Sequence, residues 1–257
     1  MALIAGPCVI ETEKIAFETA ETIQRIAGEL GIPYIYKSSY TKANRQSVTS
    51  YTGPGLKKGL KILAEIKSRF KIPILTDIHN AQEAEPVAEV ADIIQIPAFL
   101  CRQTDLVIAA AKTGKPLSIK KGQFMAPEDM AAIARKAESV GNFQVMLVER
   151  GATFGYHNLV VDFRSLPIMH KSGYPVIFDA THSLQLPGAG GTHSGGQPEF
   201  IFPLARAAIS AGCEALFIET HPCVEKALCD GANMLPLEKL KTLLTQLVQI
   251  DQLVRSF

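Results

Sequence analysis

The chain has 257 residues, of which 47% are hydrophobic and 20% charged, and this composition is typical of a globular protein rather than a disordered or disulfide-rich one. The 26 Lys and Arg residues nearly balance 25 Asp and Glu residues, so the net charge of +1 gives no electrostatic reason to expect a nucleic-acid or membrane partner. The five cysteines are odd in number and irregularly spaced, which predicts reduced thiols in a cytoplasmic protein.

Eight short apolar segments recur along the chain. Each is rich in β-branched residues and lacks strict alternation, which is typical of strands buried on both faces of a parallel sheet. The segments are residues 3–6, 33–37, 73–77, 92–96, 116–120, 144–149, 175–179 and 215–219.

Segments with helical periodicity lie between most of these strands. They are residues 13–31, 56–70, 81–90, 104–113, 127–141, 199–212 and 237–257. Several end at a glycine just before the next strand (Gly31, Gly114, Gly141 and Gly212), the residue that most often follows a helix. Eight strands with mostly helical connections predict an α/β protein, a single-domain (β/α)₈ TIM barrel over residues 1–257.

An open doubly wound sheet is the structural alternative. No Gly-x-Gly-x-x-Gly follows an early strand, so its dinucleotide-binding form has little support. Two connections, residues 38–55 and 184–198, are long and non-helical, and the second is rich in glycine. Each could cover a site as a lid or be a plain surface loop, and the sequence does not favour either.

All eight predicted strands end in polar or ionisable residues, which would converge at one end of a barrel, where barrel enzymes carry their chemistry. The cations among them and on the loop after the second strand would form a funnel suited to phosphate or carboxylate groups. These cations are Lys37, Lys42, Arg45, Lys120, Lys121 and Arg150. Some could instead pair with Asp77, Glu149 or Asp179.

A second group of strand-end residues could hold a divalent transition ion such as Zn²⁺, Fe²⁺ or Mn²⁺. It consists of Cys8, His182, Glu219 and Asp230, from neighbouring strands of a closed barrel. No Cys-x-x-Cys spacing supports the site. The other cysteines, Cys101, Cys213, Cys223 and Cys229, are expected to act as small hydrophobic residues.

Long runs of residues resemble the 3-deoxy-D-manno-octulosonate 8-phosphate synthase family, and the similarity extends over essentially the whole chain. The runs include Lys42-Ala43-Asn44-Arg45, Thr76-Asp77-Ile78-His79, Gln95-Ile96-Pro97-Ala98-Phe99, Lys120-Lys121-Gly122-Gln123-Phe124, Asp179-Ala180-Thr181-His182-Ser183 and Glu219-Thr220-His221-Pro222. The resemblance implies a homotetrameric barrel enzyme of lipopolysaccharide sugar synthesis. It would condense phosphoenolpyruvate with D-arabinose 5-phosphate and water, and release inorganic phosphate.

The resemblance also implies roles for individual residues. The phosphate and carboxylate of phosphoenolpyruvate would be held by Lys37, Lys42, Gln95, Lys120 and Arg150. Asn44 and Arg45 would face the pentose phosphate, Ser39 would belong to the substrate-binding set, and Phe99 would come from a neighbouring subunit to close the site. The catalytic set would be Asp77, His79, Lys120 and Asp230.

The family has a metal-independent branch, which carries Asn at the position of Cys8, and a metal-dependent branch. Cys8 therefore resembles the metal-dependent branch, with His182, Glu219 and Asp230 as the further ligands. The chain departs from the family at Gln46, where Ser is usual, and at Thr41, where Asp is usual, so contacts in that loop are not assigned.

Three other functions remain open at this point. A sister synthase would use erythrose 4-phosphate and give 3-deoxy-D-arabino-heptulosonate 7-phosphate, although the Lys42–Arg45 run favours the five-carbon substrate. A non-catalytic barrel would bind sugar phosphates without turnover. An aldolase would form a Schiff base at Lys120 or Lys121.

Overall fold

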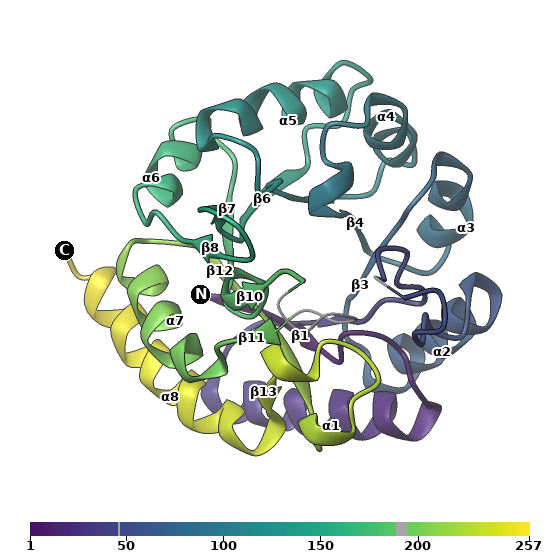
Figure 1. Ribbon diagram of the computed structural model, residues 1–257, viewed down its shortest axis with the longest axis horizontal. Helices are drawn as coiled ribbons and strands as arrows, with labels where there is room; N and C mark the ends of the chain where they lie inside the picture. The colour runs from purple at the N-terminus through teal and green to yellow at the C-terminus, as the bar shows by residue number, and fades with distance from the viewer. Residues whose placement is uncertain (46, 189–194) are drawn as a thin grey trace.

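The computed structural model describes residues 1–45, 47–188 and 195–257, and it confirms the predicted barrel. Eight parallel strands pair in chain order, and the last pairs with the first, so the sheet is closed (Figure 1). The barrel strands are β1 (Ala2–Gly6), β2 (Tyr34–Lys37), β3 (Ile74–Asp77), β4 (Ile93–Ile96), β5 (Leu117–Lys120), β6 (Val145–Glu149), β9 (Val176–Asp179) and β12 (Ala215–His221).

Helices surround the barrel as an outer ring (Figure 1). They are α1 (Glu13–Leu30), α2 (Leu56–Phe70), α3 (Ala84–Ala88), α4 (Thr104–Lys112), α5 (Met130–Glu138), α6 (Ser165–His170), α7 (Ile201–Ser210) and α8 (Leu237–Val254). The segment predicted as a helix over residues 81–90 is shorter than expected, because its first turn is a 3₁₀ helix at Ala81–Glu83. None of the helices in the described part of the chain combines the length and apolar character that a membrane crossing requires.

The ends of α1 show how local sequence sets the helix boundaries. The Thr12 hydroxyl accepts a hydrogen bond from the Ile15 backbone N–H, and Gly31 follows the helix in the left-handed conformation, with φ of 65°. The other three glycines predicted to end helices also have positive φ, which confirms their role. The α2 helix instead ends at Lys71, with φ of 55°, a position that the sequence did not single out.

Two apolar layers hold the fold together. The larger lies between the strands and the helices, and the smaller fills the barrel interior with side chains that include Ile4, Leu75, Val148, Ile177 and Phe217. A filled interior closes the lower part of the barrel, so any cavity is confined to the end where the strands finish.

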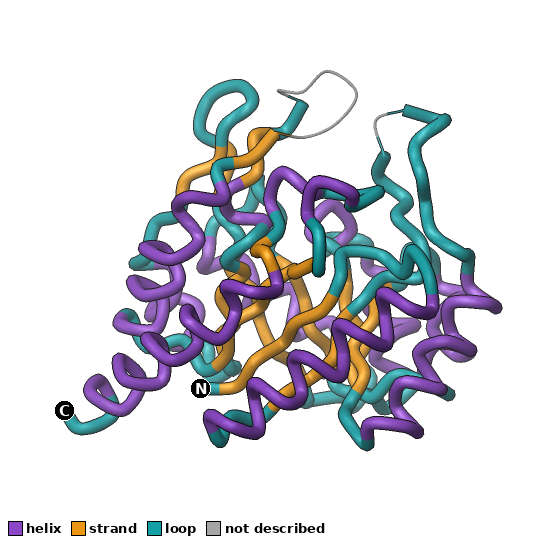
Figure 2. The backbone as a smooth tube through the Cα atoms, turned by 90° about the horizontal axis from the view of Figure 1, so that it is seen from below, coloured by secondary structure: helices purple, strands orange, loops and turns teal. Residues whose placement is uncertain are grey.

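Short elements stand above the carboxyl ends of the strands (Figure 2). Two antiparallel hairpins form there, β7 (Ala152–Thr153) with β8 (Leu159–Val160) and β10 (Gln185–Leu186) with β11 (Gly195–Gly196), and β13 (Leu235–Pro236) extends the sheet beside β12. The predicted non-helical connection over residues 184–198 therefore contains paired strands. Gln46 and the central residues 189–194 of that connection lie outside the described residues.

One close approach at this end of the barrel depends on glycine. A Cβ atom at Gly6, the last residue of β1, would lie 2.1 Å from the backbone oxygen of Lys37 at the end of β2. Only a residue without a side chain lets the two strand ends meet at this distance. The contact sets Cys8, two residues beyond Gly6, beside the side chains that end β2.

Candidate active site

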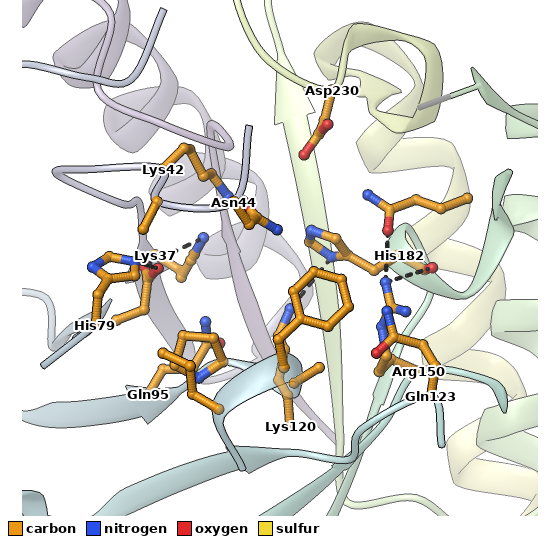
Figure 3. Close-up of a pocket in the computed structure, with 17 residues that line it drawn as sticks. Lys37, Lys42, Asn44, His79, Gln95, Lys120, Gln123, Arg150, His182 and Asp230 are labelled. Carbon is orange, nitrogen blue, oxygen red and sulfur yellow. Dashed lines mark hydrogen bonds and ion pairs between the residues drawn. The ribbon is translucent and has the colours of Figure 1, made fainter. Parts of the chain in front are cut away.

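A cavity opens at the carboxyl end of the barrel, and most of the predicted site residues line it (Figure 3). The predicted residues on its wall are Lys37, Lys42, Asn44, Asp77, His79, Gln95, Phe99, Lys120, Arg150, His182 and Asp230. The structure therefore brings together side chains from strands or following loops around most of the barrel. We call this space the anion cavity, because the ammonium groups of Lys37, Lys42 and Lys120 and the Arg150 guanidinium all line it.

Carboxylates hold the lysines of one wall in place. The Lys37 ammonium lies 3.2 Å from Glu219 and 4.0 Å from Asp77, and Lys42 lies 3.5 Å from the same Glu219 oxygen. Ser39 does not line the cavity; its hydroxyl donates to Asp77 at 2.5 Å and accepts from Lys37 at 3.0 Å. Ser39 thus positions two residues of the wall.

Asp77 also pairs with His79, which lies two residues further along the chain. The His79 Nε2 atom is 3.1 Å from Asp77 Oδ2. Burial alone would raise the pKa of the Asp77 carboxyl, but the Lys37 ammonium and the His79 ring together hold that pKa well below its usual range. Burial would lower the pKa of His79, and the hydrogen bond with Asp77 outweighs this effect and raises it. The wall therefore carries a proton-holding pair beside the lysines.

The opposite wall is built around Asp179, a residue that the sequence placed only among candidate pairing partners. Its Oδ2 atom lies 2.6 Å from the Lys120 ammonium and 2.8 Å from His182 Nδ1, while Oδ1 accepts from the backbone N–H groups of Thr181 and His182. Burial lowers the pKa of Lys120, since the nearby Asp179 only partly compensates for the loss of solvent. A carboxylate that fixes one ring nitrogen of a histidine leaves the other free to act as a ligand.

Several buried polar atoms on the cavity wall have no hydrogen-bond partner among the described residues. They are Nη1 of Arg150, Nδ1 of His79 and the side-chain oxygens of Gln95 and Gln123. The other terminal nitrogen of Arg150 donates to the Gln185 side chain at 2.6 Å and to the His182 carbonyl at 3.1 Å (Figure 3). Buried polar groups are rarely left unpaired, so the Arg150 nitrogen is suited to an anionic ligand, and the two glutamine oxygens are suited to a hydrogen-bond donor such as a hydroxyl group or a water molecule.

The four predicted metal ligands also come together, and we call Cys8, His182, Glu219 and Asp230 the metal corner. His182 Nε2 lies 3.5 Å from Glu219 Oε2, and Cys8 Sγ lies 3.4 Å from Asp230 Oδ2. Asp230 belongs to both groups of side chains that are close enough to share an ion. One thiol, one imidazole and two carboxylates form a donor set that fits a divalent transition ion.

A fifth side chain, that of Cys229, lies in the metal corner with its four predicted ligands. The sequence alone predicted only a small hydrophobic residue at this position. The Cys229 sulfur lies 3.0 Å from the Cys8 sulfur and forms a group with Cys8 and Asp230. The sequence contained one indication that Cys229 lies near the ion, namely its position directly before the predicted ligand Asp230 on the same loop. Gln123 and Gln185 are further residues of the wall that were not assigned, and Gln123 lies in the Lys120–Phe124 run.

Two predicted cations do not reach the anion cavity. Arg45 points to the metal corner, with its guanidinium 3.7 Å from Asp230 and 3.0 Å from the Cys229 sulfur, and it is not among the lining residues. Lys121 is buried against Glu149 at 3.4 Å and donates to the Gly151 carbonyl, so it does not belong to the funnel, and the alternative that some of these cations pair with Glu149 is confirmed for it. The alternation of side chains along a strand explains why Lys121 does not reach the cavity. Lys121 directly follows Lys120, so its side chain points to the opposite face.

The chain is similar to known proteins over its whole length. The DAHP synthetase I family model matches residues 1–256. A 2-dehydro-3-deoxyphosphooctonate aldolase of Desulfotalea psychrophila is 56% identical over 256 residues, covering 100% of this chain and 91% of that protein. Proteins of the same name from Geobacter sp. and Dichelobacter nodosus are 55% and 56% identical, covering 94% and 92% of their own lengths and 100% and 99% of this chain. The chain belongs to the DAHP synthetase I family.

Proposed function

We propose that this protein is a metal-dependent 3-deoxy-D-manno-octulosonate 8-phosphate synthase. It condenses phosphoenolpyruvate with D-arabinose 5-phosphate and water, and releases inorganic phosphate. The observation that carries the proposal is the metal corner placed beside an anion cavity with four cationic side chains. The names of the relatives favour the octulosonate product over the seven-carbon product of the sister synthase.

The reaction joins two anions, so positioning is the main task of the cavity. Lys37, Lys120 and Arg150 would hold the phosphate and carboxylate of phosphoenolpyruvate, with the unpartnered Gln95 oxygen available to a protonated oxygen or a bound water. Arginine offers a planar fork for carboxylate or phosphate oxygens, and lysine offers a compact charge. Well-oriented reactants can lower a barrier by roughly 7–11 kcal/mol.

The chemistry proceeds by carbon–carbon bond formation. The methylene carbon of phosphoenolpyruvate attacks the aldehyde carbon of the pentose, and the aldehyde oxygen takes up a proton. Water then adds at the second carbon of phosphoenolpyruvate and loses one proton, which balances the proton taken up by the aldehyde oxygen. The new hydroxyl group loses its remaining proton as the carbon–oxygen bond to phosphate breaks and the ketone forms, and the released phosphate takes up that proton. The Asp77–His79 pair can hold and return a proton at the cavity wall. A divalent ion held by the metal corner would supply Lewis acidity to the aldehyde or the water.

A two-substrate assay tests this function. We expect phosphoenolpyruvate plus arabinose 5-phosphate to release phosphate, the rate to be lost after chelation, and divalent metal to restore it. Cys8→Asn should weaken metal binding strongly, whereas Cys213→Ser, at a buried thiol outside the metal corner, should not. Full activity in metal-free protein contradicts the metal-dependent branch. Phosphate release with erythrose 4-phosphate alone contradicts arabinose 5-phosphate as the substrate. Substrate binding without phosphate release contradicts a catalytic function.

We also propose that the protein is a cytoplasmic homotetramer in which Phe99 reaches a neighbouring site. Exposed aromatic side chains support assembly, since Phe99, Phe124, Phe154 and Tyr156 all follow strand ends at the mouth of the barrel. Phe99 lines the cavity of its own chain, and the 55% of its surface that stays exposed there is available for contact with a neighbouring subunit. Light scattering should give four times the chain mass, and a monomer that retains full activity contradicts the shared site.

A further inference from the structure

Cys229 lies inside the metal corner rather than beside it. The side chains of Cys8 and Cys229 are 1% and 2% exposed, and their sulfurs are 3.0 Å apart. Cys229 comes from the loop between β12 and β13, which also carries Asp230, whereas Cys8 follows β1.

The two sulfurs are close enough to bind one ion after a small movement. With metal–sulfur bonds of about 2.3 Å and tetrahedral geometry, two thiolates on one ion lie about 3.8 Å apart, so the sulfurs would separate by about 0.8 Å on binding. Asp230 completes a three-residue group whose donor atoms all lie within 4.8 Å of one another. The same Asp230 belongs to the group with His182 and Glu219, so a single ion can contact members of both.

The charges around the two sulfurs also fit a second thiolate. A metal corner with two thiolates and two carboxylates carries four negative charges. The Arg45 guanidinium lies 3.0 Å from the Cys229 sulfur, and the Lys37 and Lys42 ammonium groups lie 3.2 Å and 3.5 Å from Glu219. These three cations and a divalent ion together carry five positive charges against the four negative charges, so a second thiolate leaves no uncompensated negative charge. Arg45, absent from the cavity lining, has a charge-balancing position here.

We propose that Cys229 is a second sulfur ligand of the divalent ion, in addition to Cys8, and that it biases the site toward thiophilic ions such as Zn²⁺. Soft thiolate donors favour such ions, whereas a site with one sulfur and two carboxylates accepts harder ions more readily. The inference rests on the proposed metal dependence. The competing role for Cys229 is that of a small apolar side chain, since it also packs near Val9 and Met234.

Cobalt substitution tests the proposal, because sulfur-to-cobalt charge-transfer absorption reports thiolate ligands without any need for turnover. The purified full chain is kept reduced and loaded with Co²⁺ as wild type, Cys229→Ser, Cys229→Ala and Cys8→Ser. Cys213→Ser is the matched control, since Cys213 is buried and outside the metal corner. Circular dichroism and thermal unfolding identify any variant that fails to fold.

We expect Cys229→Ser and Cys229→Ala each to lose about half of the charge-transfer intensity, as does Cys8→Ser. We also expect them to bind Zn²⁺ at least about tenfold more weakly in competition with a chelator. If both Cys229 variants match Cys213→Ser in intensity and Zn²⁺ affinity, the second sulfur ligand is refuted while the proposed function stands. If wild type shows no sulfur-to-cobalt band, the metal corner is not a metal site and both proposals are overturned. If neither Cys229 variant folds, the wild-type protein still gives a test. A charge-transfer intensity no greater than that of one cobalt-bound thiolate refutes Cys229 as a ligand.

Discussion

Replacing Asp179 by Asn is the most informative single change at the site. Asp179 is fully buried and receives hydrogen bonds from Lys120, from the His182 ring and from two backbone N–H groups. The amide of Asn has nearly the same shape, so the change removes the charge without leaving a cavity. It leaves the Lys120 ammonium buried without its nearest anion, and it replaces the acceptor that fixes the His182 ring.

The expected cost follows from these contacts. Removing one partner of a buried ion pair costs about 3–5 kcal/mol of folding stability. Burial already lowers the pKa of Lys120, so this lysine can lose its proton in the variant. We therefore expect the lower end of that range, about 3 kcal/mol. Loss of a carboxylate that orients a ligand histidine typically weakens metal binding about 10- to 100-fold, which we expect here for Zn²⁺.

Two measurements check these values. Urea unfolding of the metal-free protein gives the stability, and competition with a chromogenic chelator gives the Zn²⁺ affinity. Asp162→Asn is the control, because its carboxylate is half exposed and, within the described ranges of the chain, pairs with the exposed Arg164 alone, so neither quantity should change measurably. An Asp179→Asn protein within about 1 kcal/mol of wild-type stability, with unchanged Zn²⁺ affinity, would refute the role assigned to Asp179.

Three further predictions concern the rest of the barrel end. Nuclear magnetic resonance should find the pKa of His79 above the usual value of about 6.5, and Asp77→Asn should lower that pKa. The Asp77–His79 pair stabilises the folded protein below about pH 6.5, and this stabilisation is lost as the pH rises through the raised pKa of His79. Gly6→Ala should destabilise by about 1–3 kcal/mol or more in urea unfolding, because its Cβ meets backbone at 2.1 Å, whereas Gly28→Ala, with nothing within 4 Å, should stabilise α1 by up to about 1 kcal/mol. Gln95→Met should leave stability within about 1 kcal/mol of wild type, since the amide oxygen has no partner among the described residues, and should raise KM for phosphoenolpyruvate about tenfold or more; an unchanged KM places Gln95 outside the binding site.

The barrel was predictable because its signals are local and repeated. Each strand is a short apolar run, and glycines such as Gly31 end the helices in a conformation that other residues resist. The α6 helix escaped prediction because its six residues make fewer than two turns and include Pro167, so no periodicity develops. The hairpins of two-residue strands were missed for the same reason, since alternation needs more residues to be visible.

The site residues on strands were predictable for a geometric reason that does not extend to loops. A side chain that ends a barrel strand, such as Lys37 or Lys120, has its direction set by the strand. Arg45 lies on a loop without regular structure, so the sequence located it near the site but could not show that it points to the metal corner. Cys229 was missed because a buried cysteine without a spaced partner is more often a small hydrophobic residue.

The ion pairs of the anion cavity bear on how a product leaves the site. Lys37 and Lys42 share Glu219, and Lys120 pairs with Asp179, so each of these lysines has a carboxylate beside it when no anion is bound. A departing phosphate is then exchanged for carboxylates already within bonding distance, rather than for water alone. Such an exchange limits how tightly phosphate can be retained, so the cavity can hold two anions for reaction without becoming a trap for its own product.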